Sequence, residues 1–309
     1  MKAAGILMVL GLAPSALANW PQWRGPSADG IAPDGQVPIE WASDRNIAWK
    51  APLSGLGTST PIIWGDRVFV VTAEPTGRKV EPDKRPKVDP KFEKKTDAPD
   101  QYYRFIVMCF DRVTGQKKWE KTATEKVPHE GTHNSHSYAA GSPTTDGKLL
   151  YVSFGSFGIF CYDFDGNLKW QREIGRMNTR LGWGEAVTPV VHGESVLLNW
   201  DQEADSKLVC LNTLDGKTLW ETPRDEKTSW NTPLVVEHKG TTQVILNGTN
   251  RVRAYDLATG KSIWEIAGMT VNAIPSPLVK DGIAYVMSGY RGAATLQRRQ
   301  QWRSAQSAP

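Results

Sequence analysis

The feature that most constrains this chain is a short unit that recurs four times and ends in tryptophan. Each unit begins with Asp or Asn, has a glycine three or four residues later, and has its tryptophan four residues after the glycine. The glycines of successive units are 51, 50 and 44 residues apart. An Asp or Asn side chain accepts backbone N–H bonds across a tight turn, and Gly adopts the positive φ that such a hairpin needs. The four units are Asp111, Gly115 and Trp119; Asp163, Gly166 and Trp170; Asn212, Gly216 and Trp220; and Asp256, Gly260 and Trp264.

The residues between these units predict strands. A Ser-Pro or Thr-Pro pair precedes each unit. Alternating apolar runs such as 68–71 and 149–152 lie between the pair and the Trp, next to Gly-Asp or Asp-Gly turns. Each repeat therefore predicts four antiparallel strands. A sheet of this size cannot bury both of its faces alone, so the copies must stack around an axis, with the large Trp side chains between neighbouring sheets. We expect an all-β fold, a β-propeller with four complete blades and a partial fifth, over residues 46–292.

Three segments depart from the repeat. Residues 19–45 form an N-terminal extension, and residues 46–50, with Trp49, predict an isolated strand that finishes the last blade and hides open sheet edges. Residues 74–103 form a proline-rich insertion in the first blade, with eight basic and seven acidic residues between Glu74 and Asp100. Because this segment contains too few apolar residues to pack, we predict a solvated, mobile loop. A basic binding patch is the alternative, and the nearly cancelling charge argues against it.

The end of the chain does not continue the pattern. Residues 293–309 show neither alternation nor a turn where a third strand and another Trp unit are due. One hypothesis is that the chain is truncated or read out of frame after about Ala294. The alternative is a five-bladed ring whose last sheet is completed by the Trp49 strand.

Charge and the first residues bear on compartment and partners. The formal charge of +4 falls to −1 over residues 19–290, because Lys2 and four C-terminal arginines lie outside that range. A nearly neutral body excludes the electrostatic footprint of a nucleic-acid binder. Lys2, the apolar run 3–12 and small residues before Asn19 predict a signal peptide over residues 1–18, cleaved after Ala18. We therefore expect a periplasmic or secreted protein with no transmembrane segment.

The repeat resembles a known family. Residues 254–264, Ala-Tyr-Asp-Leu-Ala-Thr-Gly-Lys-Ser-Ile-Trp, are similar to the tryptophan-docking repeat of quinoprotein dehydrogenases. The chain as a whole resembles the secreted PQQ-binding-like β-propeller proteins of planctomycete-type bacteria. The matching segments are 19–26, 129–133, 175–177, 199–201, 223–226 and 271–277. The resemblance implies a PQQ-like propeller in an exported protein and makes PQQ a possible cofactor. A quinoprotein dehydrogenase would also need eight blades, adjacent cysteines and Ca²⁺ ligands, and no two cysteines here are adjacent.

The three cysteines occupy one repeat position. Cys109, Cys161 and Cys210 each lie two residues before the turn Asp or Asn, where the fourth blade has Ala254. Packed sheets lie about 10 Å apart, which exceeds the Cα separation that a disulfide tolerates. We predict three buried thiols and no disulfide.

Two sets of side chains are candidates for a site. His129, His133 and His136 lie beside Glu130 in a loop before the second blade, where they either bind a metal ion or only bond to neighbouring backbone. Residues just before the inner strands line the axial funnel of a propeller. These funnel candidates are Tyr138, Trp183, Glu185, Trp230, Asn231 and Asn272, with Asp201 at the end of a strand. Trp with Asn and Glu suits a planar quinone or a sugar, although Trp183 and Trp230 can instead pack between blades.

Three functions follow. The first is an exported, non-catalytic binding or scaffold module for a small ligand or a periplasmic protein partner, with some likeness to the propeller lipoprotein of outer-membrane assembly. The second is a PQQ-dependent oxidoreductase. The third is a metal-dependent hydrolase centred on the His129 loop. Glu185 and Asp201 could act as acid and base, but no nucleophile triad or phosphate loop accompanies them.

Overall fold

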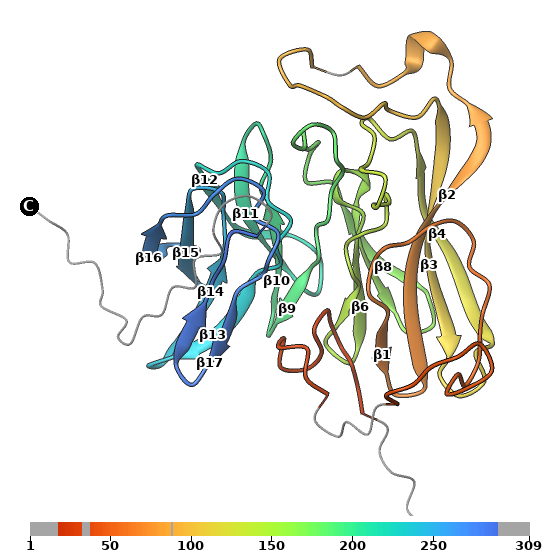
Figure 1. Ribbon diagram of the computed structural model, residues 1–309, viewed down its shortest axis with the longest axis horizontal. Helices are drawn as coiled ribbons and strands as arrows, with labels where there is room; N and C mark the ends of the chain where they lie inside the picture. The colour runs from red at the N-terminus through yellow and green to blue at the C-terminus, as the bar shows by residue number, and fades with distance from the viewer. Residues whose placement is uncertain (1–17, 33–37, 88, 290–309) are drawn as a thin grey trace, which may run out of the picture.

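The computed structural model describes residues 18–32, 38–87 and 89–289, and these form antiparallel sheets that follow one another along the chain. The predicted signal peptide over 1–18, except for Ala18, and the irregular tail over 293–309 lie outside the described residues. Figure 1 shows the sheets side by side in chain order, from the first at the right to the fourth at the left. The all-β propeller architecture, with four complete blades and a partial fifth, is confirmed.

Each complete blade is a four-stranded meander, and the fifth has two described strands. The first blade contains β1 (Ile62–Trp64), β2 (Arg67–Lys79), β3 (Gln101–Asp111) and β4 (Lys117–Lys126). The second contains β5 (Thr144–Thr145), β6 (Leu149–Ser153), β7 (Ile159–Asp163) and β8 (Leu168–Arg172). The third contains β9 (Val190–His192), β10 (Ser195–Trp200), β11 (Ser206–Asn212) and β12 (Thr218–Arg224). The fourth contains β13 (Leu234–His238), β14 (Thr241–Leu246), β15 (Arg251–Asp256) and β16 (Ser262–Ala267), and the fifth β17 (Leu278–Lys280) and β18 (Ile283–Tyr285). Two short 3-10 helices, η1 (Pro82–Lys84) and η2 (Gly155–Phe157), complete the described elements.

The predicted tryptophan units hold neighbouring blades together. The indole of Trp119 donates to the carbonyl of Phe164 in the next blade at 2.8 Å, and its ring lies under Gly166, where a Cβ would come within 2.9 Å of it. The same pairing joins Trp170 to Thr213 and Trp220 to Leu257. Two separate reasons therefore require glycine at this position. Its φ is positive, and the indole ring occupies the space that a Cβ would need.

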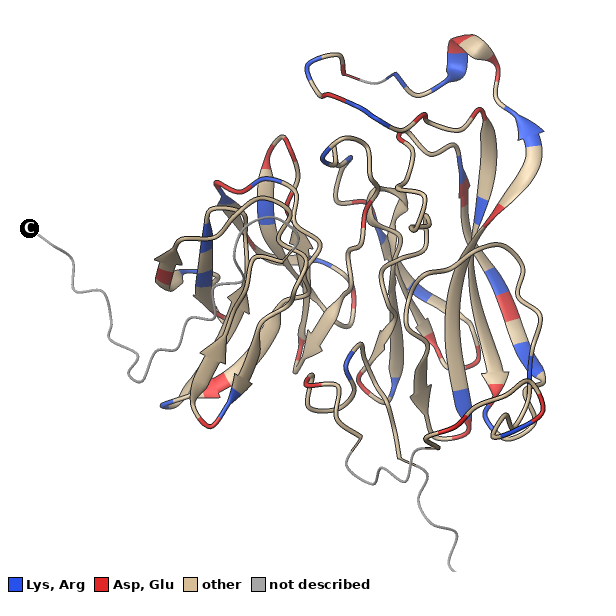
Figure 2. Cartoon of the chain, in the orientation of Figure 1, with Lys and Arg blue, Asp and Glu red and all other residues tan. Residues whose placement is uncertain are grey.

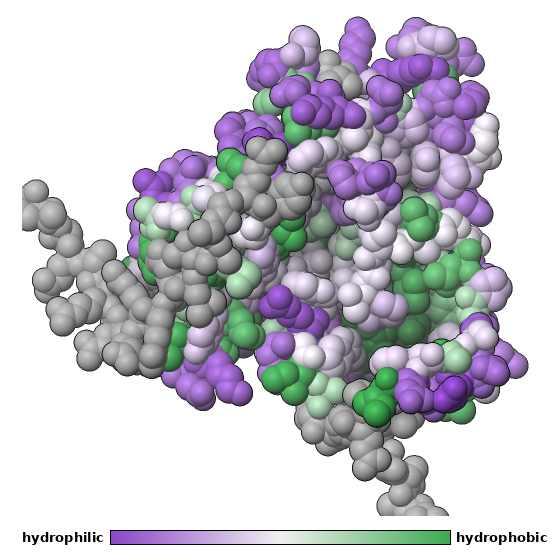
Figure 3. Space-filling view, in the orientation of Figure 1, coloured by the Kyte–Doolittle hydropathy of each residue, from purple (hydrophilic) through white to green (hydrophobic). Residues whose placement is uncertain are grey.

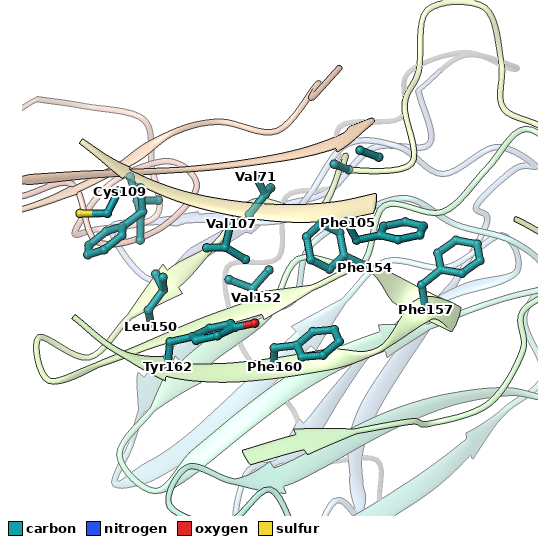
Figure 4. Close-up of a cluster of buried hydrophobic side chains, with 14 residues drawn as sticks. Val71, Phe105, Val107, Cys109, Leu150, Val152, Phe154, Phe157, Phe160 and Tyr162 are labelled. Atoms are coloured by element: carbon teal, nitrogen blue, oxygen red, sulfur yellow. The ribbon is translucent and has the colours of Figure 1, made fainter. Parts of the chain in front are cut away.

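The apolar core lies between the sheets rather than in one central mass. Figure 4 shows the cluster between the first and second blades, where Val107 and Phe105 of β3 face Val152 and Phe160 of the second blade. Comparable clusters join the second blade to the third, the third to the fourth, and the fourth to the fifth. This arrangement follows from central strands that are continuous buried runs, such as residues 105–110 of β3 and 196–200 of β10, and therefore bury both sheet faces.

The cysteine prediction is confirmed. Cys109, Cys161 and Cys210 are buried free thiols, each paired across its strand with the blade tryptophan, and Ala254 has the same pairing with Trp264. A β-bulge follows this position in all four sheets. The cysteines are thus equivalent residues of successive blades.

Trp49 takes the docking position on the first blade, but the strand predicted for 46–50 does not form. Its indole donates to the carbonyl of Arg112 at 2.8 Å and lies against Gly115, as the tryptophan of a preceding blade would. Residues 46–50 pair with neither β17 nor β18 in the described part of the chain. The contact with the first blade is therefore made by the Trp49 side chain, through Arg112 and Gly115, and not by a paired strand.

The insertion is docked in part rather than solvated throughout. β2 and β3 extend into it, so that the connection covers 80–100, and Figures 2 and 3 show its mixed charges and hydrophilic surface. Yet Lys95 donates its backbone N–H to Leu181 at 2.9 Å, and Thr96 donates its hydroxyl to Gly182. Polar backbone and side-chain contacts fix this segment where the sequence offered too few apolar residues to predict packing.

Candidate functional site

The segments that enter the five blades meet around one pocket. It encloses about 630 Å³ at the end of the propeller opposite the Asp-Gly turns. One residue from each entry illustrates its wall: Thr58 of the first blade, His136 of the second, Trp183 of the third, Trp230 of the fourth, and Asn272 of the fifth. Because each inner strand begins next to the axis, residues before it line this pocket, and three of the funnel candidates lie there: Trp183, Trp230 and Asn272.

Two tryptophans form the largest apolar part of this wall. The rings of Trp183 and Trp230 lie 6.2 Å apart at an interplanar angle of 32°. Trp230 donates its indole N–H to the carbonyl of Gly184 at 2.8 Å, which anchors the ring across the junction between the third and fourth blades. The rings of His133 and Trp183 pack edge to face, with their centroids 5.8 Å apart. Both tryptophans are half-buried, so they pack between blades and also present ring surface to the pocket.

Asn272 and His136 supply polar side chains to the pocket. Asn272 lies in the left-handed region with φ 64°, a conformation that Asn tolerates, and its buried Oδ1 has no hydrogen-bond partner. His136 has its Nε2 3.1 Å from the carbonyl of Glu185, and burial lowers the pKa of this imidazole. A neutral imidazole therefore lines the same space as the two indoles, and Asn272 borders it with a buried amide oxygen that has no partner.

The other funnel candidates lie elsewhere. Tyr138 and Glu185 border a separate small cavity, and Asn231 is buried with its amide bonded to the carbonyl of Asn247 at 3.1 Å. Asp201 does not reach the funnel, because it is fully buried in an ion pair with Arg224 at 2.7 Å. The structure therefore places Asp201 outside the axial pocket. A buried carboxylate at a strand end needs a counter-ion, and Arg224 of the same blade supplies it.

The structure also separates the three histidines. His133 and His136 line the pocket, whereas His129 lies buried behind it with its Nε2 2.7 Å from the carbonyl of Met177. The three histidines His129, His133 and His136 of the expected metal site are thus not brought together around one space. In the described residues, the group whose ligand atoms converge is His129, Glu130 and Glu185, all within 4.8 Å of one another.

Sequence reasoning missed several of the polar partners. Lys94 of the insertion reaches Glu130, and Arg224 reaches Asp201. For the contact between Lys94 and Glu130, the sequence offers only a weak signal, which is a charged insertion followed by a loop that contains an acidic residue. Nothing local in the sequence indicates which of the eight basic residues there is buried.

Comparison with known families gives a match along most of the chain. The family described as outer membrane protein assembly factor BamB matches residues 34–198 and, in a second overlapping match, residues 103–309. The chain belongs to this family. The PQQ-like propeller resemblance seen in the sequence is confirmed. A comparison with curated proteins found no significant match.

Solved structures with a similar arrangement are distant. BamB from Moraxella catarrhalis is 17% identical over 71% of this chain and 59% of that one, with a TM-score of 0.43. Quinohemoprotein alcohol dehydrogenase ADHIIG from Pseudomonas putida HK5 is 14% identical, with 82% and 48% covered and a TM-score of 0.42. A europium-containing methanol dehydrogenase is 14% identical, with 69% and 51% covered and a TM-score of 0.38. The chain spans about half to three-fifths of the length of these structures.

PQQ does not fit the donor set of the pocket. This quinone carries three carboxylates, so a site for it needs cationic or strongly donating side chains. The described residues that line the pocket include neither Lys nor Arg, and the unpaired group of Asn272 is an acceptor. The two indoles offer stacking surface, but nothing in the pocket neutralises a trianion.

Proposed function

We propose that this chain is an exported, non-catalytic propeller that binds a protein partner or small ligand in its axial pocket. The group that enters is uncharged, with a flat apolar face for Trp183 and Trp230 and a hydrogen-bond donor for Asn272. The single observation that carries this proposal is the buried Oδ1 of Asn272, which lacks a partner beside an aromatic wall. A buried acceptor left unpaired costs about 1–3 kcal/mol, which a ligand donor would recover.

Membership of the family described as outer membrane protein assembly factor BamB supports a protein partner. Such a partner would present a side chain or loop to the pocket, and a small neutral ring would use the same contacts. The export signal predicted over residues 1–18 supports a periplasmic or secreted location. Recovery of the chain from the periplasmic fraction with Asn19 as its first residue would test the location. In the described residues, none of the helices has the length and apolar character to cross a bilayer.

Ligand-detected NMR with a panel of neutral planar heterocycles and neutral monosaccharides tests the pocket. We expect at least one class of probe to bind, and Trp230→Ala and Asn272→Ala to weaken it by about tenfold each, roughly 1.4 kcal/mol. The matched control is Trp41→Ala, because Trp41 is 63% exposed and lies outside the pocket. Equal binding by all three variants would overturn the proposed site.

A spectroscopic titration separates this function from oxidoreductase activity. Added PQQ and Ca²⁺ are expected to leave no quinone absorbance band with the protein after gel filtration. A retained stoichiometric band would replace the binding-module proposal with a quinone enzyme.

A further inference from the structure

A second polar cluster lies outside the axial pocket, on the same loops that enter the second and third blades. His129 and Glu130 come from the loop that enters the second blade, and Glu185 comes from the loop that enters the third. One ligand atom of each residue lies within 4.8 Å of the others, and the three side chains are almost completely buried. None of these groups belongs to the pocket that carries the proposed function.

The cluster borders a small, partly open cavity. Glu130 and Glu185 lie on its polar side, and Tyr138, Phe154 and Phe157 close it on the apolar side. The space measures about 10 Å³, which is the size of a single water molecule or ion. Aromatic walls would exclude a larger ligand and would strengthen any charge interaction inside.

One carboxylate oxygen in this space has no partner. Glu185 accepts the backbone N–H of Ser156 at 2.7 Å through Oε2, whereas Oε1 has no hydrogen bond and lies 3.8 Å from Nε2 of His129. Glu185 is more than nine-tenths buried.

The cluster has two acidic groups and one resident cation. Lys94 reaches in from the insertion, with its Nζ 2.5 Å from Oε2 of Glu130 and 3.3 Å from the carbonyl of Thr179. Thr179 also donates its hydroxyl to Glu130. The ammonium therefore compensates Glu130, and no cationic side chain pairs with Glu185 among the described residues.

We propose that His129, Glu130 and Glu185 bind one divalent metal ion of the zinc or manganese class, with Lys94 as the internal cation that the metal displaces. Imidazole nitrogen with two carboxylates is a ligand set that suits such ions. The ion would satisfy the free oxygen of Glu185 and would release the Lys94 ammonium from Glu130. Backbone pairing of residues 94 and 95 with Leu181 holds this part of the insertion in place, so metal binding requires only the Lys94 side chain to change its conformation.

Calorimetric titration of the chelator-treated full chain with Zn²⁺ and with Mn²⁺ tests this site. We expect one equivalent of metal to bind. Glu185→Gln keeps the acceptor for Ser156 and the side-chain shape but removes the charge, and it should weaken binding at least about tenfold. His133→Ala is the matched control, because this histidine lies on the axial pocket, and its affinity should equal that of the wild type.

The Lys94→Met variant distinguishes a metal site from a purely structural cluster. If metal and ammonium compete for Glu130, removal of the ammonium should tighten metal binding by about tenfold or more. Thermal unfolding of each variant checks that it is folded, and a Co²⁺ absorption spectrum reports ligation directly. The proposal is overturned if Glu185→Gln binds as tightly as the wild type, if Lys94→Met does not tighten binding, or if His133→Ala loses as much affinity as Glu185→Gln.

Discussion

The indole nitrogen of Trp170 in β8 donates a hydrogen bond to the carbonyl of Thr213, at the end of β11, across a distance of 2.8 Å. The ring of Trp170 lies beneath Gly216 in the same turn, where a Cβ would come within 2.6 Å of it. One residue of the second blade thus fixes both the backbone and the side-chain space of a turn in the third. This relationship recurs at each junction between complete blades.

The docking of Trp170 predicts a large penalty for Gly216→Ala. The comparison is Gly193→Ala, because both glycines have positive φ but nothing lies within 4 Å of a Cβ at Gly193. Both variants incur the backbone cost, and only Gly216→Ala collides with an aromatic ring. We expect Gly216→Ala to lose about 1–3 kcal/mol more of unfolding free energy than Gly193→Ala in urea denaturation. Equal losses would show that the ring is not confined by the turn.

The buried pair of Asp201 and Arg224 predicts a strong loss of stability when one partner is removed. Arg224 also donates to Tyr255 and to the carbonyl of Asn247 in the fourth blade, so that it joins two blades. Arg224→Leu leaves Asp201 as an uncompensated buried charge and should cost about 3–5 kcal/mol.

Two further variants give the controls for this pair. Arg45→Leu breaks the exposed pair with Glu40 and should cost about 0–1 kcal/mol. The double variant Asp201→Leu/Arg224→Leu should recover part of the loss, because no isolated charge remains. A double variant less stable than Arg224→Leu alone would contradict the charge argument. Denaturant unfolding measures all three.

The turn carboxylate of Asp111 predicts a loss of stability in acid. Backbone and side-chain hydrogen bonds from Thr114 and the ammonium of Lys118 lower the pKa of Asp111 below its usual value. A lowered folded-state pKa stabilises the protein above the unfolded-state pKa of about 4, and this contribution disappears as the pH falls further. We expect the unfolding free energy to decrease below about pH 4.

Asp111→Asn isolates that contribution. Asn212 occupies the equivalent position in the third blade and accepts the N–H of Leu214 at 2.8 Å, so an amide can form the same turn. The variant should be less stable than the wild type at pH 7 and should lose less stability between pH 5 and pH 2.5. Parallel pH curves for the two proteins would show that Asp111 does not contribute.

The three buried thiols predict very slow chemical labelling. Burial raises the pKa of Cys109 and of Cys161 to about 12, and that of Cys210 to about 11. Because the thiolate is the reactive form, a disulfide reagent at pH 8 should modify none of them in the folded chain. All three should react in urea, which absorbance can count. Rapid labelling of the native protein would indicate that a blade interface opens.

The repeat was readable from the sequence because its contacts follow a local rule. Trp119 and Gly166 come from neighbouring repeats, and the interval between copies gives their relative positions in space. The same register predicts that Cys109, Cys161 and Cys210 occupy one buried position in successive blades. Trp183 and Trp230 could be assigned to the funnel because they precede the inner strands of their blades.

The polar contacts of the candidate site do not follow the repeat and could not be predicted from the sequence. The sequence grouped His129 with His133 and His136 because they are close in the chain, yet the loop turns His129 away from the other two. Asp201 was placed near the funnel because a strand ends there, and its pairing with Arg224 depends on where the fourth strand of that blade returns.

The sequence by itself determined the blades of this protein, their order and the residues that lock them together, because hydrogen-bonded strands and docked rings repeat at a regular interval. Only the tertiary structure decided that Glu130, Glu185 and Lys94 share one buried space. These residues come from the insertion and from the entries of two different blades, so that no local interval encodes their meeting. Their proximity depends on how the loops pack once the sheets are stacked.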